Sequence, residues 1–403
     1  MRLYGKTLPE VFQLLPWPYK IVVTMGSAFF LFAVPYSLNF FFTLGVYTQQ
    51  PGPLSFPGLP KTIQGLLDPS LAADEKGNAI LAHTVIQNVS VGDKVLYSTN
   101  IVMERSKGPS CRGWATTSEG YLPQEDEALL PNGVDKLPRG MWTAETPSIV
   151  YDPDDPEKAW KLYVYEYYWN GNDEMARYYS FIGLRTAPSV DGPWTTKEWV
   201  LSAAPDRPPA PYSGLVRQNI NPLHKDLANV WFYSRPSVIY HKGILFMSLS
   251  AFLRGSKAPD FTVLLASTDH GKTWGYRGTL LRASDAEKAG NYTKYNGASL
   301  LLHKDQAYVA AVFGNANVDG LGSFLIPFDG PTGLLKAQVK RDEKGAPVVA
   351  KWIKRQSMEP SKAGGGHVAF TDKCDTGILV SEYSDIRQSF QIFKTYLTPT
   401  SED

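Results

Sequence analysis

Several signatures of large protein classes are missing from this sequence. Its 403 residues include only two cysteines, Cys111 and Cys374, which lie far apart and form no CxxC or other metal-ligand spacing. No P-loop, dinucleotide-binding fingerprint, haem CxxCH or HExxH motif is present. We therefore expect no cofactor and no metal site.

Neither sign of charge dominates the sequence. The 40 Lys and Arg residues balance 39 Asp and Glu residues, which leaves a formal net charge of +1. The positive residues form no long basic block. Since nucleic-acid-binding proteins carry a basic patch or stripe, we expect no nucleic-acid partner.

The two cysteines leave two alternatives open. In an oxidising compartment, Cys111 and Cys374 would join the first and last parts of the folded domain. In a reducing compartment they would be buried, unpaired thiols, a common state of free cysteine. The sequence does not decide between these states.

Charged residues are absent from residues 21–46. This stretch exceeds the ~20 apolar residues that a helix needs to cross a bilayer, and aromatic residues flank it on both sides as they do at membrane interfaces. A secretory signal would have an apolar core of only about 7–15 residues and a small-x-small cleavage site after it. We therefore predict an uncleaved transmembrane helix over residues 21–48, with membrane contact through 21–46.

Positive charge is concentrated before this stretch. Arg2, Lys6 and Lys20 precede it, and the next lysine is Lys61. Because cytoplasmic flanks carry the excess of Lys and Arg, residues 1–20 are predicted to be cytoplasmic. The rest of the chain would then be extracytoplasmic, or periplasmic in a bacterium, in a single-pass membrane protein.

Prolines interrupt regular structure after the apolar stretch. Four of them fall within residues 51–60, where they disfavour both a helix and the interior of a sheet. We predict a Pro/Gly-rich linker over residues 49–70 and a folded domain over residues 71–403.

Helical periodicity is also absent after the linker. Aromatic residues make up 13% of the sequence, and its 34 Gly and 30 Pro favour many turns. A unit of two apolar strands and a turn recurs, most clearly from Glu145, Arg235, Asn296 and His367, with a weaker copy over 79–102. Five such units that pack both faces against their neighbours form a closed ring. We predict an all-β, five-bladed β-propeller.

One turn is identifiable in detail. Between two apolar runs the chain reads S-T-D-H-G-K-T-W, with Ser267, Asp269, Gly271, Thr273 and Trp274 at the fixed positions. Side-chain oxygens of Ser and Asp accept backbone N–H bonds in tight turns, and glycine supplies positive φ. The pattern resembles the Asp-box of sialidase-type β-propellers. That resemblance implies a structural turn on the outer part of a blade, without a catalytic role.

A second turn also resembles a known family. Residues 189–194 read S-V-D-G-P-W, which is similar to a turn of five-bladed glycosidases of the arabinanase, xylosidase and fructosidase types. The resemblance covers about residues 75–400 and concerns the fold.

Candidate site residues follow from the repeat. In a propeller the innermost strand of each blade starts beside the central funnel, so its first polar residue faces that funnel. Here those residues are Glu145, Arg235, Asn296 and His367, which together would form a polar, ligand-binding pocket.

Glycoside hydrolysis requires two carboxyl groups that flank the bond. The five-bladed glycosidases supply an Asp, an Asp and a Glu at the starts of their first three blades. By that resemblance Glu145 would be the acid, but the weak first copy offers His83 and no carboxyl. The hydrolytic set is therefore incomplete in this interpretation. Arg235 could serve as one of the three arginines of a sialidase, although no motif beyond the Asp-box supports that activity.

Two functions remain from this reasoning. The first is a non-catalytic binding or scaffold subunit, anchored in the membrane and accessory to a larger membrane protein complex. The alternative is a membrane-tethered glycoside hydrolase that acts on a carbohydrate, with Glu145 as acid and Arg235, Asn296 and His367 on sugar hydroxyls. A second carboxyl near Glu145 would favour the hydrolase.

The acidic segment 152–157 is a weaker candidate for calcium. It lacks the order of ligands that an EF-hand has, so a solvated acidic turn is the favoured interpretation.

Overall fold

The computed structural model describes residues 2–3, 6–7, 52–91, 94–108, 111–117, 140–204, 212–290, 292–314, 319–326, 339–353, 363–384, 389–396 and 398–399. The chain divides into two compact units, Met1–Pro51 and Gly52–Asp403. In the first unit the described residues form only a short antiparallel pair, β1 (Arg2–Leu3) with β2 (Lys6–Thr7).

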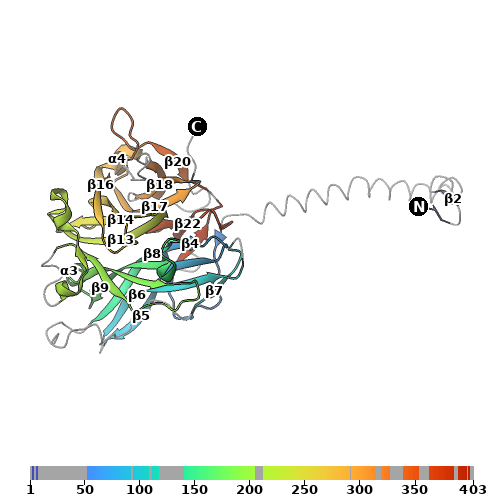
Figure 1. The fold of residues 1–403 in the computed structure, drawn as a ribbon, viewed down its shortest axis with the longest axis horizontal. Coiled ribbons are helices and arrows are strands. Elements are labelled where there is room, and N and C mark those ends of the chain that lie inside the picture. Colours follow the sequence, from blue (N-terminus) through green and yellow to red (C-terminus); the bar gives the residue numbers. More distant parts are fainter. Residues whose placement is uncertain are drawn as a thin grey trace. The chain divides into compact units, whose positions relative to one another are not determined.

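The second unit is built from five antiparallel sheets that follow one another along the chain (Figure 1). Each sheet begins with its innermost strand. Blade 1 contains β4 (Gly65–Ala73), β5 (Ala79–Val91), β6 (Lys94–Ser106) and β7 (Trp114–Thr116). Blade 2 contains β8 (Met141–Tyr151), β9 (Trp160–Trp169), β10 (Ser180–Ala187), β11 (Glu198–Ser202) and a parallel edge strand, β12 (Gln218–Asn219).

The remaining three blades repeat the four-stranded plan. Blade 3 contains β13 (Val230–His241), β14 (Ile244–Leu253), β15 (Phe261–Ser267) and β16 (Gly275–Arg282). Blade 4 contains β17 (Lys294–His303), β18 (Gln306–Gly314), β19 (Asp319–Ile326) and β20 (Val349–Ile353). Blade 5 contains β21 (Ala363–Ala369), β22 (Leu379–Ser384), β23 (Ser389–Lys394) and, from the start of the unit, β3 (Gly52–Pro53).

Short helices lie in the connections between strands. They are α3 (Asp173–Tyr178), α4 (Ala283–Gly290) and the 3-10 turns η2 (Pro156–Lys158), η3 (Tyr212–Leu215), η4 (Asn221–Leu223) and η5 (Lys225–Leu227). The innermost strands contact one another in the cyclic order β4, β8, β13, β17, β21 and back to β4. The predicted all-β, five-bladed propeller is therefore confirmed.

The core lies between the blades because both faces of each sheet are covered. On β5, the side chain of Leu81 packs toward blade 5, while its neighbours Ile80 and Ala82 pack toward blade 2. This is the alternation expected of a strand, whose successive side chains point to opposite faces. Each of five apolar clusters fills one interface between neighbouring blades.

In every blade the pairing between the innermost strand and the second strand is irregular, at the same level of the ring. The register with the second strand shifts between Leu67 and Ser70, Glu145 and Ser148, Ser234 and Ser237, Tyr295 and Gly297, and Ala363 and Val368. In blades 1 to 3 the residue before a Pro-Ser pair has positive φ: Asp68 at 49°, Thr146 at 52° and Arg235 at 54°. A bulge bends its strand and re-aims a side chain, here at the centre of the ring.

Serine side chains connect one blade to the next, four of them on innermost strands and Ser381 on β22. Each accepts a backbone N–H bond from a neighbouring innermost strand, at 2.8–3.1 Å: Ser70 from Ile149, Ser148 from Val238, Ser237 from Leu300, Ser299 from Val368, and Ser381 from Asp68. These five bonds form a closed circle, which we call the serine ring.

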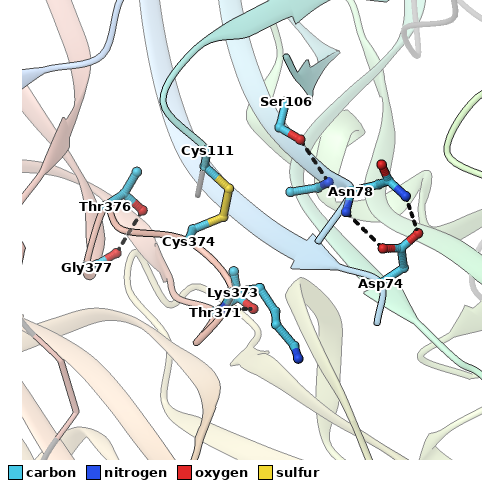
Figure 2. Close-up of a disulfide and its surroundings, with 10 residues drawn as sticks. Asp74, Asn78, Ser106, Cys111, Thr371, Lys373, Cys374, Thr376 and Gly377 are labelled. Atoms are coloured by element: carbon cyan, nitrogen blue, oxygen red, sulfur yellow. Dashed lines mark hydrogen bonds between the residues drawn. A yellow bond between two sulfur atoms is a disulfide. The ribbon is translucent and has the colours of Figure 1, made fainter. Parts of the chain in front are cut away.

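The ring of blades is also closed by two contacts between segments distant in sequence. Strand β3 pairs with β23, so the start of the unit supplies the outer edge of blade 5. Cys111, between β6 and β7, forms a disulfide with Cys374, between β21 and β22 (Figure 2). The pairing of the two cysteines, which the sequence left open, therefore joins blade 1 to blade 5.

The ring takes in part of the segment 49–70 that the prolines had predicted to be a linker. Pro53 lies on the edge strand β3, and Pro69 lies at the bulge of β4. Both are positions where a sheet tolerates a residue without an N–H donor. The weak first copy of the repeat was predicted to begin at residue 79, which is too late. The innermost strand of blade 1 is β4, which precedes the predicted copy 79–102.

The prediction of a single-pass membrane protein is contradicted. Within the part of the chain that the structure describes, no helix is long and apolar enough to cross a bilayer. The predicted span, residues 21–48, lies outside the described residues, as does nearly all of the predicted cytoplasmic segment 1–20. The absence of charged residues from 21–46 is a feature of composition, and composition alone does not establish a helix.

The Asp-box closes the outer hairpin of blade 3, between β15 and β16. Asp269 accepts bonds from the N–H of Thr273 (2.9 Å), the hydroxyl of Thr273 (2.7 Å) and the hydroxyl of Ser267 (2.7 Å). Gly271 has φ of 85°, and a Cβ there would lie 2.4 Å from the hydroxyl of Tyr163. Trp274 is 3% exposed and packs in the interface of blades 2 and 3.

We predict that Ser148→Ala weakens the ring. The buried N–H of Val238 would lose its acceptor, which costs about 1–3 kcal/mol in the free energy of unfolding. Urea denaturation measures this loss. Ser284→Ala, at an exposed position of α4, is the control and should stay within about 0.5 kcal/mol of the wild type. Equal stability of the two variants would contradict the role of the serine ring.

We also predict that Asp269→Ala lowers the free energy of unfolding by about 1–3 kcal/mol, because the donors in the turn lose their acceptor. Burial opposes ionisation of Asp269, but hydrogen bonds from Thr273 and Ser267 outweigh it and lower its pKa. The stabilisation is therefore present above the ordinary pKa of an Asp and is lost as the pH falls below it. Thermal melts at neutral and acid pH test this, with Thr268→Ala in the same turn as control. Melting of Asp269→Ala together with the wild type would refute it.

Candidate functional site

The bulges of the innermost strands bring polar side chains together at the centre of the ring. Glu145, Arg235, Asn296 and His367 each lie at or beside the bulge of their blade, on β8, β13, β17 and β21. His367 is 3% exposed, whereas the other three keep an intermediate exposure. We call this group, with Asp68, the funnel site.

Asp68 is the carboxyl that the sequence interpretation missed. It lies at the bulge of β4, is 5% exposed, and its Oδ2 accepts a bond from the hydroxyl of Thr84 at 3.3 Å. Asp68 precedes Pro-Ser just as Thr146 and Arg235 do. That repeated Pro-Ser was the signal that could have identified it. The first blade therefore does supply an acid.

Glu145 has an unusual ionisation. Burial, and next the charge of Asp68, raise the pKa of Glu145 from 4.5 to about 7, while Arg235 and a hydrogen bond from Tyr167 act against the rise. The hydroxyl of Tyr167 donates to Oε2 of Glu145 at 3.4 Å. Near neutral pH this carboxyl is thus divided between its protonated and its ionised form.

Tyrosines of β9 form a wall of the funnel site. The hydroxyl of Tyr167 lies 3.0 Å from that of Thr99 on β6, and the rings of Tyr165 and Tyr167 are 5.1 Å apart. Burial, followed by the charge of Glu145, raises the pKa of Tyr167 well above its ordinary value. Its hydroxyl therefore stays protonated near neutrality and acts as a hydrogen-bond donor to Glu145.

His367 and Arg235 each present an unused polar atom. The ring of His367 donates to the backbone carbonyls of Arg235 and Pro147, on the opposite side of the funnel, and burial lowers its pKa. The imidazole is therefore neutral at pH 7, with Nε2 as an acceptor. Among the described residues, neither Nε2 of His367 nor Nη1 of Arg235, both buried atoms, has a hydrogen-bond partner.

The other predicted residues are those of the Asp-box and Asn296. The five Asp-box residues belong to the outer hairpin of blade 3 and do not reach the funnel site. Asn296 lies at the bulge of β17 with intermediate exposure. It remains a predicted ligand-binding residue.

The acidic segment 152–157 is solvated at Asp154 and Glu157, as predicted, but not at Asp152. Asp152 is fully buried, and the ammonium of Lys161 lies 3.2 Å from Asp152 and 2.8 Å from Asp155. Nδ1 of His270, from the Asp-box turn, lies 3.1 Å from Asp152. The ligand atoms of Asp152, Asp155 and His270 fall within 4.8 Å of one another. Lys161 already supplies the positive charge that balances these carboxylates, so the cluster does not fit a metal ion. Through His270 the cluster connects blades 2 and 3.

A small cavity of about 10 Å³, room for about one water molecule, lies between blades 2 and 3. Its lining includes Arg177, Tyr178, Ser180, Trp231 and Phe232. The cavity belongs to the same interface as Tyr165, whose ring lies 6.2 Å from that of Phe232. This cavity was not predicted, because its residues come from α3, β10 and β13 and share no sequence motif.

Comparisons with known proteins agree with this fold. No family profile matches the sequence, and no curated protein matches it either. Among solved structures, a glycosyl hydrolase from Bacteroides ovatus matches at 11% identity and a TM-score of 0.49, over 87% of this chain and 94% of that one. A member of the family 130 mannoside phosphorylases and their hydrolases matches at 10% and 0.48, over 87% and 94%.

An exo-1,5-α-L-arabinanase from a bovine ruminal metagenomic library matches at 10% identity and a TM-score of 0.41, over 71% of this chain and 83% of that one. At such identities the likeness concerns the fold alone. The predicted fold-level resemblance to glycosidase-type propellers is confirmed.

We predict that Glu145→Gln stabilises the protein at neutral pH. Because the pKa of Glu145 is raised from 4.5 to about 7, the folded protein holds a proton that the unfolded chain releases. The contribution of Glu145 to stability is thus present below pH 4.5 and is lost as the pH rises to about 7, by up to about 3 kcal/mol.

The measurement is urea unfolding of wild type and variant at pH 4.5 and pH 8. The difference between them should grow with pH in favour of Glu145→Gln. Glu287→Gln, at an exposed position of α4, should show no such growth. A difference that is independent of pH would show that Glu145 has an ordinary pKa.

Proposed function

We propose that the funnel site binds a carbohydrate and cleaves a glycosidic bond, with Glu145 as general acid and Asp68 as its partner carboxylate. The observation that carries the proposal is the pair of carboxyl groups on adjacent innermost strands, one of which raises the pKa of the other. Such a pair is what glycoside hydrolysis requires, because one carboxyl must be protonated and the other ionised.

The hydrogen bond from Tyr167 supports a different role for each oxygen of Glu145. Tyr167 donates to Oε2, so the proton of the acid form resides on Oε1. Glu145 would transfer that proton to the glycosidic oxygen as the bond to the anomeric carbon breaks. The leaving sugar then departs as a neutral alcohol.

Asp68 acts at the anomeric carbon, on the side from which that carbon is attacked. It would either accept a proton from the water that attacks the anomeric carbon, or attack that carbon itself and be released by water in a second step. The anomeric configuration of the product distinguishes the two routes. Thr84, which donates to Oδ2 of Asp68, orients the carboxylate in both.

The neutral His367 supports substrate binding. Its ring is held by carbonyls of two other blades, so the unpartnered Nε2 has a defined direction. A sugar hydroxyl would donate to it. Asn296 would bind a second hydroxyl through its amide group.

A second candidate function is binding without catalysis. It is supported by Arg235, which occupies the start of the third blade, where the resemblance to five-bladed glycosidases implies a carboxyl. In that case the five residues of the funnel site would hold a carbohydrate ligand without breaking it.

Hydrolysis of aryl-glycosides by the purified protein tests the proposal. We expect Glu145→Gln and Asp68→Asn to lower kcat by about 10²-fold or more, the usual contribution of a general acid or base. The rate of the wild type should fall as the pH rises through about 7, because Glu145 then loses its proton. Glu287→Gln should retain the activity of the wild type.

Other results would reject the catalytic role. Full turnover by Glu145→Gln would exclude Glu145 as the acid. Binding of glycans without turnover across the pH range would favour the non-catalytic function instead.

A further inference from the structure

One hairpin of the ring extends beyond the innermost strand of its blade. Strands β5 and β6 have 13 residues each, which makes them the longest strands among the described residues. The innermost strand β4 begins at Gly65, opposite Ile86 of β5, so residues 87–98 project past it. We call this segment the rim hairpin. Asp68 lies three positions after Gly65, which puts the rim hairpin on the same side of the ring as the funnel site.

Hydrogen bonds tie the base of the rim hairpin to the funnel site. Thr143, on the innermost strand of blade 2, accepts the backbone N–H of Thr99 at 3.2 Å. The hydroxyl of Thr99 lies 3.0 Å from that of Tyr167, which donates to Glu145. Two successive hydrogen bonds therefore connect the hairpin to the carboxyl that is the acid in the proposed function.

The two faces of the rim hairpin differ in what they contact. Successive side chains of a strand point to opposite faces, so Tyr97 shares a face with Thr99, whose hydroxyl is directed at Tyr167. Leu96 lies on the other face, and a Cβ at Gly171 would lie 3.5 Å from its Cδ2. Gly171 belongs to the connection between β9 and α3. The hairpin therefore rests on blade 2 through one face and turns the other toward the funnel site.

The face that carries Tyr97 is open to solvent and partly apolar. Tyr97 and Val95 are each 67% exposed, and within the described part of the chain only Leu215 joins them as an exposed large apolar residue. Asn88 lies directly opposite Tyr97, and Ser90 lies opposite Val95, both exposed. This face thus presents an aromatic ring and a branched aliphatic group beside an amide and a hydroxyl, and none of these four residues is charged.

The size and the chemistry of this surface suit a sugar. A sugar ring has C–H groups on its faces, which pack against an aromatic ring, and hydroxyls on its edge, which hydrogen-bond to an amide. A stable protein interface buries about 800 Å² on each partner, whereas a tyrosine offers only about 150–250 Å². Tyr97 lies about 7 Å from Thr99 along the strand, so a carbohydrate chain held in the funnel site reaches Tyr97 with its next units.

We propose that Tyr97 stacks on a neutral sugar unit that follows the one in the funnel site, and that Asn88 binds hydroxyls of this unit. The ligand is then an oligosaccharide and not a single sugar. The proposal rests on the proposed function in taking the ligand to be a carbohydrate, and it is independent of whether the funnel site cleaves that ligand.

A series of chain lengths tests the proposal. The probes are neutral oligosaccharides of glucose, mannose, galactose, xylose and arabinose with one to four units, first on a glycan array and then in isothermal titration calorimetry. Glu145→Gln is the parent protein throughout, so that no probe is cleaved. For a sugar that binds, lengthening the chain from one unit to three should raise the affinity by about tenfold or more, and Tyr97→Ala in the same parent should remove most of this gain.

Matched variants locate the effect. Tyr97→Phe keeps the ring, so it should retain the gain to within about twofold. Asn88→Ala should reduce the gain only a few-fold, because its hydrogen bonds compete with those of water. Leu215→Ala removes the exposed apolar side chain that lies elsewhere, on η3, and should bind as its parent does. Because Tyr97 is exposed, Tyr97→Ala should melt at the temperature of its parent, so that a loss of affinity reports the lost contact.

The outcomes separate this proposal from the proposed function. A gain with chain length that depends on Tyr97, without turnover of any aryl-glycoside by the wild type, would exclude the hydrolase and support the stacking role. Turnover of aryl-glycosides with an equal gain in Tyr97→Ala and its parent, or with no binding of any oligosaccharide, would retain the hydrolase and overturn the stacking role. A dimer in sedimentation that Tyr97→Ala dissociates would assign the surface to a second copy of the chain and also overturn it.

Discussion

The serine ring is the interaction on which the rest of this structure depends. The innermost strand is an edge of its sheet, so only alternate N–H groups can join the ladder with the second strand of the same blade. The bulges interrupt those ladders, and Ser70, Ser148, Ser237, Ser299 and Ser381 supply acceptors across the blade boundary instead. Because buried N–H groups are costly to leave unpaired, the irregularity that points side chains at the centre also joins the blades.

The residues of the funnel site lie at or beside the bulges of the innermost strands. Asp68, Glu145 and Arg235 come from three different blades, yet their charges act on one another because each lies at the same level of its strand. Burial, and next the charge of Asp68, raises the pKa of Glu145, which costs stability at neutral pH. The interblade apolar clusters and the disulfide between Cys111 and Cys374 offset this cost. The stability lost at the funnel site is thus offset by burial between the blades.

Local patterns were predictable where their physical cause is local. The Asp-box turn depends on hydrogen bonds within a few residues, and the five repeated strand pairs depend on alternating burial along each strand. Asp68 was not predicted as a site residue because Pro69 was assigned to a linker, although a bulge accommodates proline. The burial of Asp152 was missed because its partner Lys161 lies on the following strand, and His270 comes from another blade. Neither contact is visible as a spacing.

By itself, then, the sequence determined an all-β ring of five blades, the structural turn at Asp269, and the polar character of the residues at the starts of the blades. Alternation and turn chemistry act over a few residues, so they can be recognised without coordinates. Only the tertiary structure decided that Cys111 meets Cys374, that Asp68 lies near enough to Glu145 for its charge to raise the pKa of Glu145, and that His270 meets Asp152. These contacts depend on how the ring closes, and closure brings together residues whose separation along the chain carries no information about their distance in space.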